Sequence, residues 1–316
     1  MLYSFEEYVI KCKKNIRMHY LYRISSLMFQ MGYEPKHEEF WKILIEKLEE
    51  EFDGLLPYQQ ILCVLLLCKY EIYLQKFISK IFSLEYLQKL DIWLQENKEN
   101  KITCTLTERK LMMLNRYLVI ECPELRVPWI MQNLRYNNRK KESISDKLDR
   151  LVTFHMLYDT EAASSNAMWV KQRKKKYRDY IVFESSHRKK VFRNRFEPVL
   201  ADLVGPQSYR RAVVLPYYYT ADFDMYTTAK GLPMDYDVAK NIVDPTVKRF
   251  VFILMTANDY CFNSIRKLAS KEMKIRHLQI LGYNVVEIPI YEWDSALHYT
   301  KRDKMKYLQR RIFELL

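Results

Sequence analysis

The sequence predicts two parts of different fold class. The first is an N-terminal helical repeat-like bundle, and the second is a small C-terminal α/β domain. Glycine and proline are scarce, at 5 and 10 of 316 residues, which favours long helices joined by short loops. Residues 1–105 have a helical pattern throughout, whereas residues 250–290 alternate apolar runs with one amphipathic stretch. The predicted domains are residues 1–105, 106–205 and 206–316.

The first helical region contains a weak internal repeat, in which Tyr33 and Phe40 are matched 37 residues later by Tyr70 and Phe77. Such a period is typical of stacked helix pairs in solenoid proteins. An ordinary helical bundle with coincidental matches explains the same pattern, so both architectures stay open.

A polar joint at residues 96–107 separates this region from the next helix, which we expect to begin with Thr107 as its N-cap. A second boundary is predicted near Gly205 and Pro206, where helix-breaking residues stand before a strand pattern.

The C-terminal part predicts three strands, a helix and a fourth strand. A hairpin comes first, with strands at 211–215 and 222–228. Residues 250–255 are apolar on both faces, as in a central strand. Residues 271–281 repeat apolar side chains at helical spacing, and Gly282 occupies the position where a helix C-cap favours glycine. Residues 285–290 predict the last buried strand.

The charge of the chain indicates an anionic partner. It carries 52 Lys+Arg against 39 Asp+Glu, a formal net charge of +13. Nucleic acid and an acidic membrane surface both suit such a surplus, and a basic protein without either partner is the third interpretation. The sparse glycines argue against a glycine-rich phosphate loop.

The densest basic stretch, residues 171–195, is another candidate RNA-contacting surface. Such runs of charge usually form a solvated helix face or loop, but the four aromatic residues among its cations weaken that interpretation. Charge reversal at Lys174, Lys175 and Lys176 is expected to lower RNA affinity and flatten its salt dependence. The candidate RNA-binding residues here are Lys171, Arg173, Lys174, Lys175 and Lys176.

The six cysteines include no CxxC pair and have no histidine at metal-binding spacing, which predicts buried, reduced thiols of an intracellular compartment. No apolar run reaches the roughly 18 residues of a membrane span. The first residues include two early acids, so the N-terminus gives no clear transit peptide or secretory signal.

Two motifs resemble known modules. The pattern Arg-His-Leu-x-x-Leu-Gly-Tyr-x-Val-Val-x-Ile-Pro at 276–289, followed by Tyr-Glu-Trp at 291–293, resembles the RAP domain of organellar RNA-binding proteins. The pattern Leu-Asn-Arg-x-Leu-x-x-Glu-Cys-Pro-Glu-Leu-x-x-Pro-Trp at 114–129 resembles a FAST kinase-like segment, and the helices before it resemble the other FAST segment more loosely. Together they resemble the FAST kinase domain-containing protein family.

This resemblance implies a mitochondrial matrix protein that binds single-stranded transcripts and governs their processing, stability or translation. It also implies protein partners in RNA granules or the mitochondrial ribosome. A protein-interaction scaffold with a basic surface is an alternative. Kinase activity is not expected, because the chain has no glycine-rich loop, no His-Arg-Asp loop and no Asp-Phe-Gly metal site.

A metal-dependent ribonuclease is the other alternative, because RAP domains resemble the core of PD-(D/E)XK nucleases and the predicted β-β-β-α-β order suits that topology. Such enzymes hold Mg²⁺ or Mn²⁺ between strand carboxylates and use a nearby lysine. The strand positions where the RAP pattern often has acids are Ile253 and Met255 here. No cofactor is expected unless this alternative holds, and its weak catalytic candidates are Asp222, Asp224, Asp259 and Lys274. Simple roles compete for these carboxylates, such as exposure on a strand or the capping of a turn.

The predicted RAP helix supplies the remaining candidate RNA-binding residues, Lys271, Lys274, Arg276 and His277. Lys274 and His277 are three residues apart and therefore share a helix face. For His277, a buried hydrogen-bonding role is the equally weighted alternative. Tyr291 and Trp293 are expected to be core or cap aromatics rather than stacking platforms. RNA binding without chemistry is the function that the sequence favours.

Overall fold

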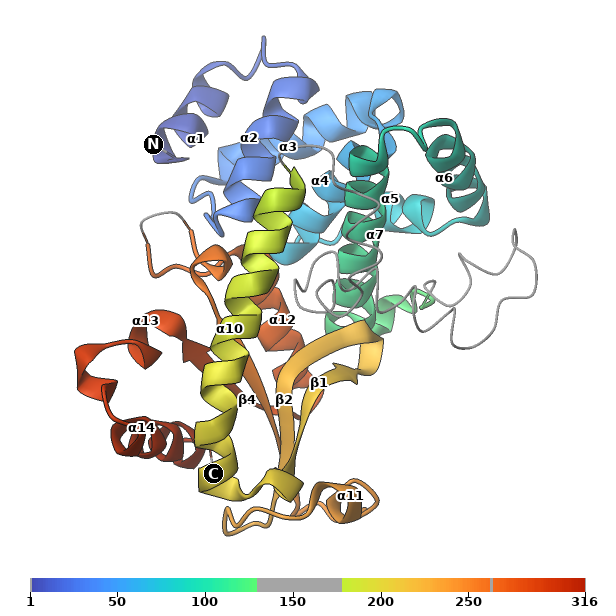
Figure 1. Ribbon diagram of the computed structural model, residues 1–316. Helices are drawn as coiled ribbons and strands as arrows, with labels where there is room; N and C mark the ends of the chain where they lie inside the picture. The colour runs from blue at the N-terminus through green and yellow to red at the C-terminus, as the bar shows by residue number, and fades with distance from the viewer. Residues whose placement is uncertain (1, 130–177, 262–263, 316) are drawn as a thin grey trace. The chain divides into compact units, whose positions relative to one another are not determined.

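The chain divides into two compact units in the computed structural model, which describes residues 2–129, 178–261 and 264–315 (Figure 1). The first unit comprises Met1–Asn138 with Ile265–Met273, and the second comprises Arg139–Ser264 with Lys274–Leu316, within those described ranges. No helix among the described residues has the length and apolar composition that crossing a bilayer requires.

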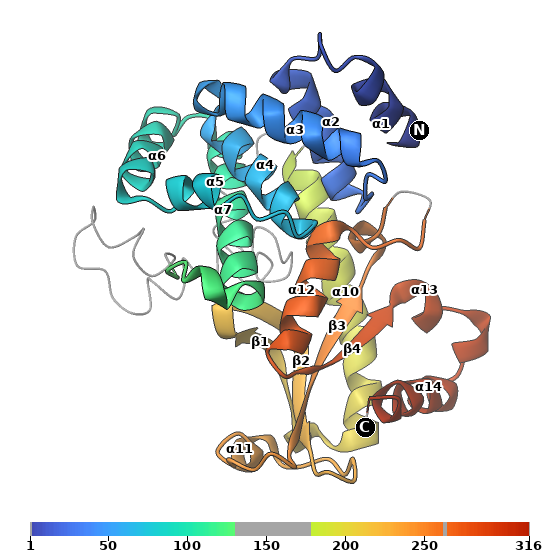
Figure 2. The same ribbon diagram turned by 180° about the vertical axis from the view of Figure 1, so that it is seen from behind.

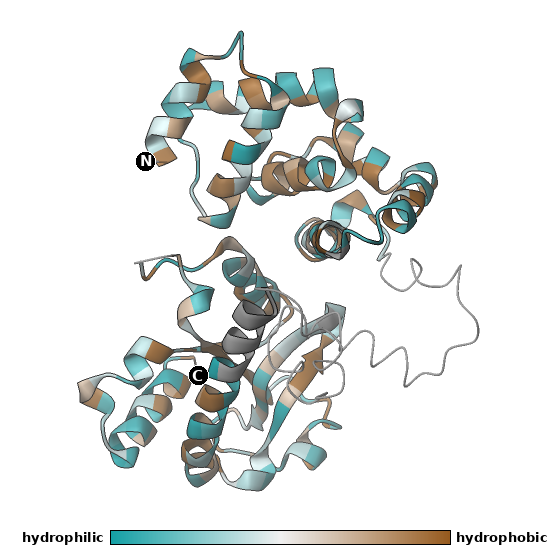
Figure 3. Cartoon of the chain, turned by 45° about the horizontal axis from the view of Figure 1, so that its top comes forward, coloured by the Kyte–Doolittle hydropathy of each residue, from teal (hydrophilic) through white to brown (hydrophobic). Residues whose placement is uncertain are grey.

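The first unit is helical, and its helix α4 is the most enclosed. Every residue of α4 from Gln59 to Cys68 is buried, which suits a helix that is apolar on all sides. Helix α4 packs against α2 and α7. Figure 3 shows hydrophobic and hydrophilic residues alternating around the other helices, as expected where one face is solvated. The elements are α1 (Leu2–Lys11), α2 (Met18–Gln30), α3 (Glu38–Glu51), η1 (Phe52–Gly54), α4 (Pro57–Lys69), α5 (Gln75–Ile81), α6 (Leu84–Glu96), α7 (Lys101–Glu121) and η2 (Pro123–Leu125).

The predicted internal repeat corresponds to two helix pairs, α2–α3 and α4–α5. Tyr33 follows α2 and Tyr70 follows α4, and the hydroxyl of Tyr70 donates a hydrogen bond to the carbonyl of Tyr33 at 2.6 Å. Phe40 of α3 and Phe77 of α5 are both buried. The matched residues therefore occupy corresponding positions in the two pairs.

Helix α7 begins earlier than the sequence predicted. Asn100 is the N-cap, accepting from the backbone N–H of Thr103 at 3.3 Å. Thr107 lies inside the helix, where its hydroxyl donates to the Thr103 carbonyl at 2.7 Å. The expected N-cap role of Thr107 is wrong, because its hydroxyl bonds back to the carbonyl four residues earlier and asparagine caps equally well.

The second unit is built around a four-stranded sheet of order β1-β2-β3-β4, in which only the β3–β4 pair is parallel. Figures 1 and 2 show α10 crossing one face of the sheet and α12 lying on the other. The elements are α10 (Arg178–Val204), η5 (Pro206–Ser208), β1 (Tyr209–Leu215), η6 (Pro216–Tyr218), β2 (Tyr219–Thr227), α11 (Tyr236–Ala239), β3 (Lys248–Met255), η7 (Ala257–Asp259), α12 (Ala269–Ile280), β4 (Asn284–Pro289), α13 (Ile290–Trp293), η8 (Ala296–His298) and α14 (Lys301–Phe313). The start of α12, up to Met273, belongs to the first unit.

The core of this unit joins the sheet to α10 and α14. Phe196 of α10 contacts the rings of Phe223, Phe252 and Trp293, with centroids 5.1 to 5.8 Å apart. Trp293 is fully buried, as predicted for a core aromatic, whereas Tyr291 is 48% exposed and is not part of the core. The compact unit therefore includes α10 as well as residues 206–264 and 274–316, within the described ranges.

The order of strands and helix agrees with the predicted β-β-β-α-β arrangement, and the finer likeness to PD-(D/E)XK nucleases stays a prediction. Gly282 has a φ of +86°, the left-handed conformation expected just after a helix. The last strand ends at Pro289, and Ile290 begins α13 instead of extending the strand.

Candidate functional site

The carboxylate of Asp222 on β2 is held by three groups of the chain itself. Arg193 Nη2 donates to Oδ1 at 2.7 Å, and the backbone N–H of Leu254 donates to Oδ2 at 2.7 Å. Lys189 Nζ lies 3.4 Å from Oδ2. All three ionic side chains are buried, and the two cations are four residues apart on α10, so they project from one face. This cluster, Asp222 with Lys189 and Arg193, joins α10 to the sheet through buried ion pairs.

Asp224, two residues along β2, is fully buried and is matched by an arginine. Arg249 donates from Nε to Oδ1 at 3.0 Å and from Nη2 to Oδ2 at 2.6 Å. Its guanidinium also lies about 5 Å from the ring centroids of Tyr226 and Tyr283. Burial acts to lower the pKa of Arg249, but the hydrogen bond and charge of Asp224 outweigh it and raise the pKa. The arginine is therefore a permanent cation held between two rings.

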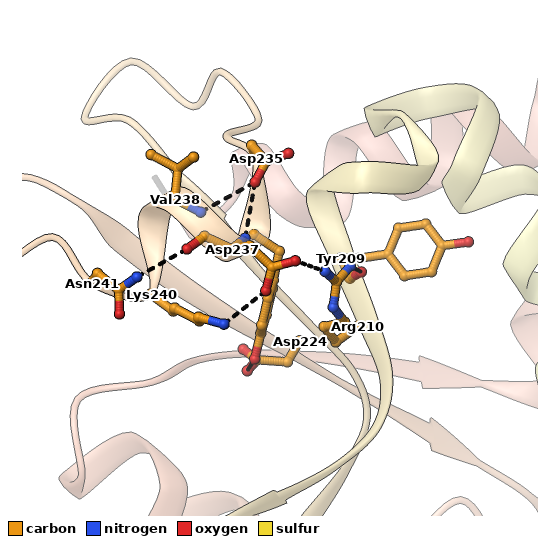
Figure 4. A network of polar contacts seen from close by, with 9 residues as sticks. Tyr209, Arg210, Asp224, Asp235, Asp237, Val238, Lys240 and Asn241 are labelled. Carbon is orange, nitrogen blue, oxygen red and sulfur yellow. Dashed lines mark hydrogen bonds and ion pairs between the residues drawn. The ribbon is translucent and has the colours of Figure 1, made fainter.

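The Asp224 group continues to α11 through Tyr236. Figure 4 shows Arg210, Asp237 and Lys240, which lie in the same network. The Tyr236 hydroxyl donates to Asp224 Oδ2 at 2.8 Å, and burial followed by the Asp224 charge raises its pKa, so the phenol stays protonated. Arg210 lies over the Tyr236 ring and donates to Asp237, which also accepts from Lys240 at 2.8 Å. The hydrogen bond from Lys240 is the main cause that lowers the pKa of Asp237. The cations at this end of the sheet are thus matched by neighbouring acids.

The β2 carboxylates are poor ligands for a divalent cation in this arrangement. Each already accepts from a guanidinium, so Mg²⁺ or Mn²⁺ would have to displace Arg193 or Arg249 and then lie beside its positive charge. Ile253 is apolar and buried on the neighbouring strand. Within the described residues, no group of three or more His, Cys, Asp or Glu side chains is placed to hold a metal.

The third nuclease candidate, Asp259, caps a turn, which is the simpler of the two roles considered for it. Its Oδ2 accepts from the backbone N–H of Thr256 at 2.7 Å and from the Thr256 hydroxyl at 2.9 Å. The side chain is buried in the turn that follows β3. It lies on a different element from the two β2 carboxylates.

The structure corrects the expectation that Lys274 and His277 face RNA together. His277 is fully buried, with Nδ1 2.7 Å from the hydroxyl of Tyr219 on β2. Lys274 is 7% exposed, and its Nζ lies 3.4 Å from Thr220 Oγ1. The two residues do share a helix face, but that face packs on the sheet. The alternative of a buried hydrogen-bonding His277 is the one observed.

Two of the remaining predicted RNA-binding residues lie on α12, and the other five lie outside the described residues. Arg276 is exposed on α12, and Lys271 is half-buried on the same helix. The predicted residues Lys171, Arg173, Lys174, Lys175 and Lys176 lie outside the described part of the chain.

Helix α14 is a basic element that the sequence interpretation did not single out. Asp303 is its one acidic residue, against six cations. The inward side carries the buried Tyr307, Leu308 and Ile312. A spacing of four between cations, opposite these apolar residues, is the signal that would have identified the helix. The six cations are Lys301, Arg302, Lys304, Lys306, Arg310 and Arg311.

Two family matches correspond to the segments described above. Residues 257–311 match the RAP domain, and residues 26–91 match FAST kinase-like protein, subdomain 1. The RAP match spans α12, β4, α13 and most of α14.

The chain is also similar to curated FAST kinase domain-containing proteins. It is 24% identical to the mitochondrial FAST kinase domain-containing protein 1 of Mus musculus, over 88% of this chain and 30% of that protein. The Xenopus laevis protein of the same name is 26% identical over 94% of this chain and 33% of its own length. The human mitochondrial FAST kinase domain-containing protein 3 is 33% identical over 36% of this chain and 16% of its length. The chain thus spans about a third of the first two relatives, and the predicted resemblance to this family is confirmed.

Proposed function

We propose that this chain, with its FAST kinase-like segment and RAP domain, binds single-stranded RNA and regulates mitochondrial transcripts. The observation that supports this most directly is the position of exposed cations inside the RAP-matched residues 257–311, on α12 and α14. The formal charge of +13 adds a general attraction for polyanions. The mitochondrial setting follows the names of the relatives.

The proposed activity is binding without cleavage. The buried carboxylates of β2 are engaged by arginines of the same unit, so they serve to hold the sheet and its helices together. RNA contact then depends on exposed cations and aromatic rings, which is how proteins bind unpaired strands. With Mg²⁺ or Mn²⁺ added, the purified chain should leave RNA intact. Metal-dependent cutting that is lost in Asp222→Asn, while that variant stays folded and still binds RNA, would instead establish the nuclease.

Fluorescence anisotropy with a labelled, unstructured RNA tests the binding. The full chain should bind, and the logarithm of its association constant should fall linearly with the logarithm of salt concentration. Absence of binding at about 0.05 M salt, where phosphate contacts are strong, would contradict the proposal.

In cells, crosslinking and sequencing of bound RNA should recover mitochondrial transcripts. Recovery of protein partners that survive RNase treatment, with no crosslinked RNA, would favour the scaffold alternative.

A further inference from the structure

Helix α14 has an outward face whose cations make few contacts with the rest of the described chain. Its inward face packs in the core and is fixed by hydrogen bonds, from the Tyr307 hydroxyl to Glu292 Oε2 at 2.7 Å and from Arg311 to the Glu287 carbonyl at 3.0 Å. Arg302, Lys306 and Arg310 point the other way. They are spaced by four residues, so they form one solvent-facing row along the helix.

The three side chains are weakly engaged. Arg302 has no ion pair with any other described residue, and Lys306 has only its proximity to Asp303. Arg310 lies 3.8 Å from Glu314 in a pair that is exposed on both sides. Pairs of this kind contribute little to stability. The row is therefore available to an external anion.

Helix stability accounts for Arg310, which lies in the last turn where a cation is favourable, but it does not account for Arg302. Arg302 lies in the first turn, near the positive end of the helix dipole, where a cation is unfavourable. The helix end is already capped, because Thr300 accepts from the backbone N–H of Asp303 and Asp303 accepts from Thr300. The capped N-terminus of the helix therefore does not offer these backbone N–H groups to an anion. An anion would instead contact the side chains of the outward row.

An aromatic ring precedes the row. Tyr299 is 87% exposed, and its ring contacts no other aromatic residue among those that the structure describes. It stands one residue before the N-cap Thr300 and three before Arg302. Unpaired bases stack on exposed aromatic rings, while nearby cations contact the phosphates. An exposed tyrosine that precedes a row of cations therefore supplies the two kinds of side chain that bind a single-stranded nucleic acid.

We infer that the α14 row, meaning Arg302, Lys306 and Arg310, forms with the ring of Tyr299 a contact surface for single-stranded RNA. This inference rests on the proposed function and names the residues that would contact the RNA. The row contacts successive phosphates, and Tyr299 stacks on one base.

The first test removes charge from the row in the full chain, with anisotropy on an unstructured RNA across a salt series. Each phosphate contact on a single strand contributes about 0.7 to the salt slope, so Arg302→Gln/Lys306→Gln should reduce the slope by about 1.4. At about 0.1 M salt this corresponds to roughly 25-fold weaker binding. The matched control, Lys230→Gln/Lys240→Gln, removes the same formal charge from exposed lysines outside α14 and should change affinity far less.

The second test separates stacking from charge. Tyr299→Ala should weaken binding about 5-fold or more, whereas Tyr299→Trp should retain it. Leu297→Ala is the local control, since Leu297 is 83% exposed in the same segment but has no π-face. A loss for Tyr299→Ala that tryptophan restores would support stacking, and no loss would overturn this part of the surface.

The outcomes distinguish the surface from the function. Equal losses in the α14 variant and its control, with the unaltered chain binding RNA, would overturn the α14 surface and leave RNA binding intact. An unaltered chain that binds no RNA would contradict the proposed function itself. If that chain instead bound phosphatidylserine vesicles, and the α14 variant did not, the surface would be a membrane contact and the RNA assignment would be wrong.

Discussion

Replacing Asp222 by alanine should greatly destabilise the C-terminal unit. The substitution removes the carboxylate that Lys189 and Arg193 share in the buried interior, and it removes the acceptor of the Leu254 N–H. Removing one partner of a buried ion pair typically costs about 3–5 kcal/mol. Domains are stable by only about 5–15 kcal/mol, so this loss is a large fraction of the total.

Hydrogen exchange is the assay that locates the effect. Amides of β2 and β3, including Leu254, should exchange faster in Asp222→Ala, and the unfolding temperature should fall. Asp222→Asn keeps an acceptor oxygen for the Leu254 amide while losing the charge, so its effect should be intermediate. A control with the same chemical change is Asp237→Ala, which breaks the exposed pairs with Arg210 and Lys240 and should cost less than about 1 kcal/mol.

Equal, small effects of Asp222→Ala and Asp237→Ala would refute this reasoning. The buried cations would then have to be stabilised by other groups, and α10 would not depend on β2 for its attachment. The same result would reopen Asp222 as a functional carboxylate, because its replacement would leave the fold unchanged.

Two further predictions concern single positions. Gly282→Ala should lower stability by about 1 kcal/mol in urea unfolding, because Gly282 has a φ of +86°, whereas Gly54→Ala, at an open position without that constraint, should be nearly neutral. Burial lowers the pKa of Lys110 from 10.5 to about 7, so the unfolded chain binds more protons between these values and stability rises with pH across that window. Lys110→Met should therefore stabilise the chain by about 1 kcal/mol near pH 6, and an unfolding series in which this gain failed to shrink toward about pH 10 would contradict the reasoning.

Local patterns predicted the elements of the C-terminal unit well. The buried strand β3 follows from its own apolar residues, and the end of α12 follows from the glycine at position 282. The structure has both features where they were expected. Asn100 and Thr107 are both good N-cap residues and lie seven residues apart. The residues between them are polar and have no clear helical pattern, so the sequence did not show that the helix already begins after Asn100. Choices between neighbouring candidates of equal propensity depend on packing.

The partners of Asp222 could not be found in the same way. Arg193 is 29 residues away on another element, and no period links the two. The burial of His277 likewise depends on which side of α12 meets the sheet, because that helix has polar residues on more than one side. These features become visible only when the tertiary arrangement is known.

The same arrangement changes the meaning of the net charge. Lys189 and Arg193 belong to the densest basic stretch of the sequence, yet both are buried against Asp222 and are unable to reach a phosphate. Arg249 is similarly occupied by Asp224. Since a salt slope counts only the cations that contact phosphates, RNA binding should be less salt-dependent than the composition suggests. The cations that decide affinity would be fewer and would lie on exposed helix faces, such as the outward row of α14.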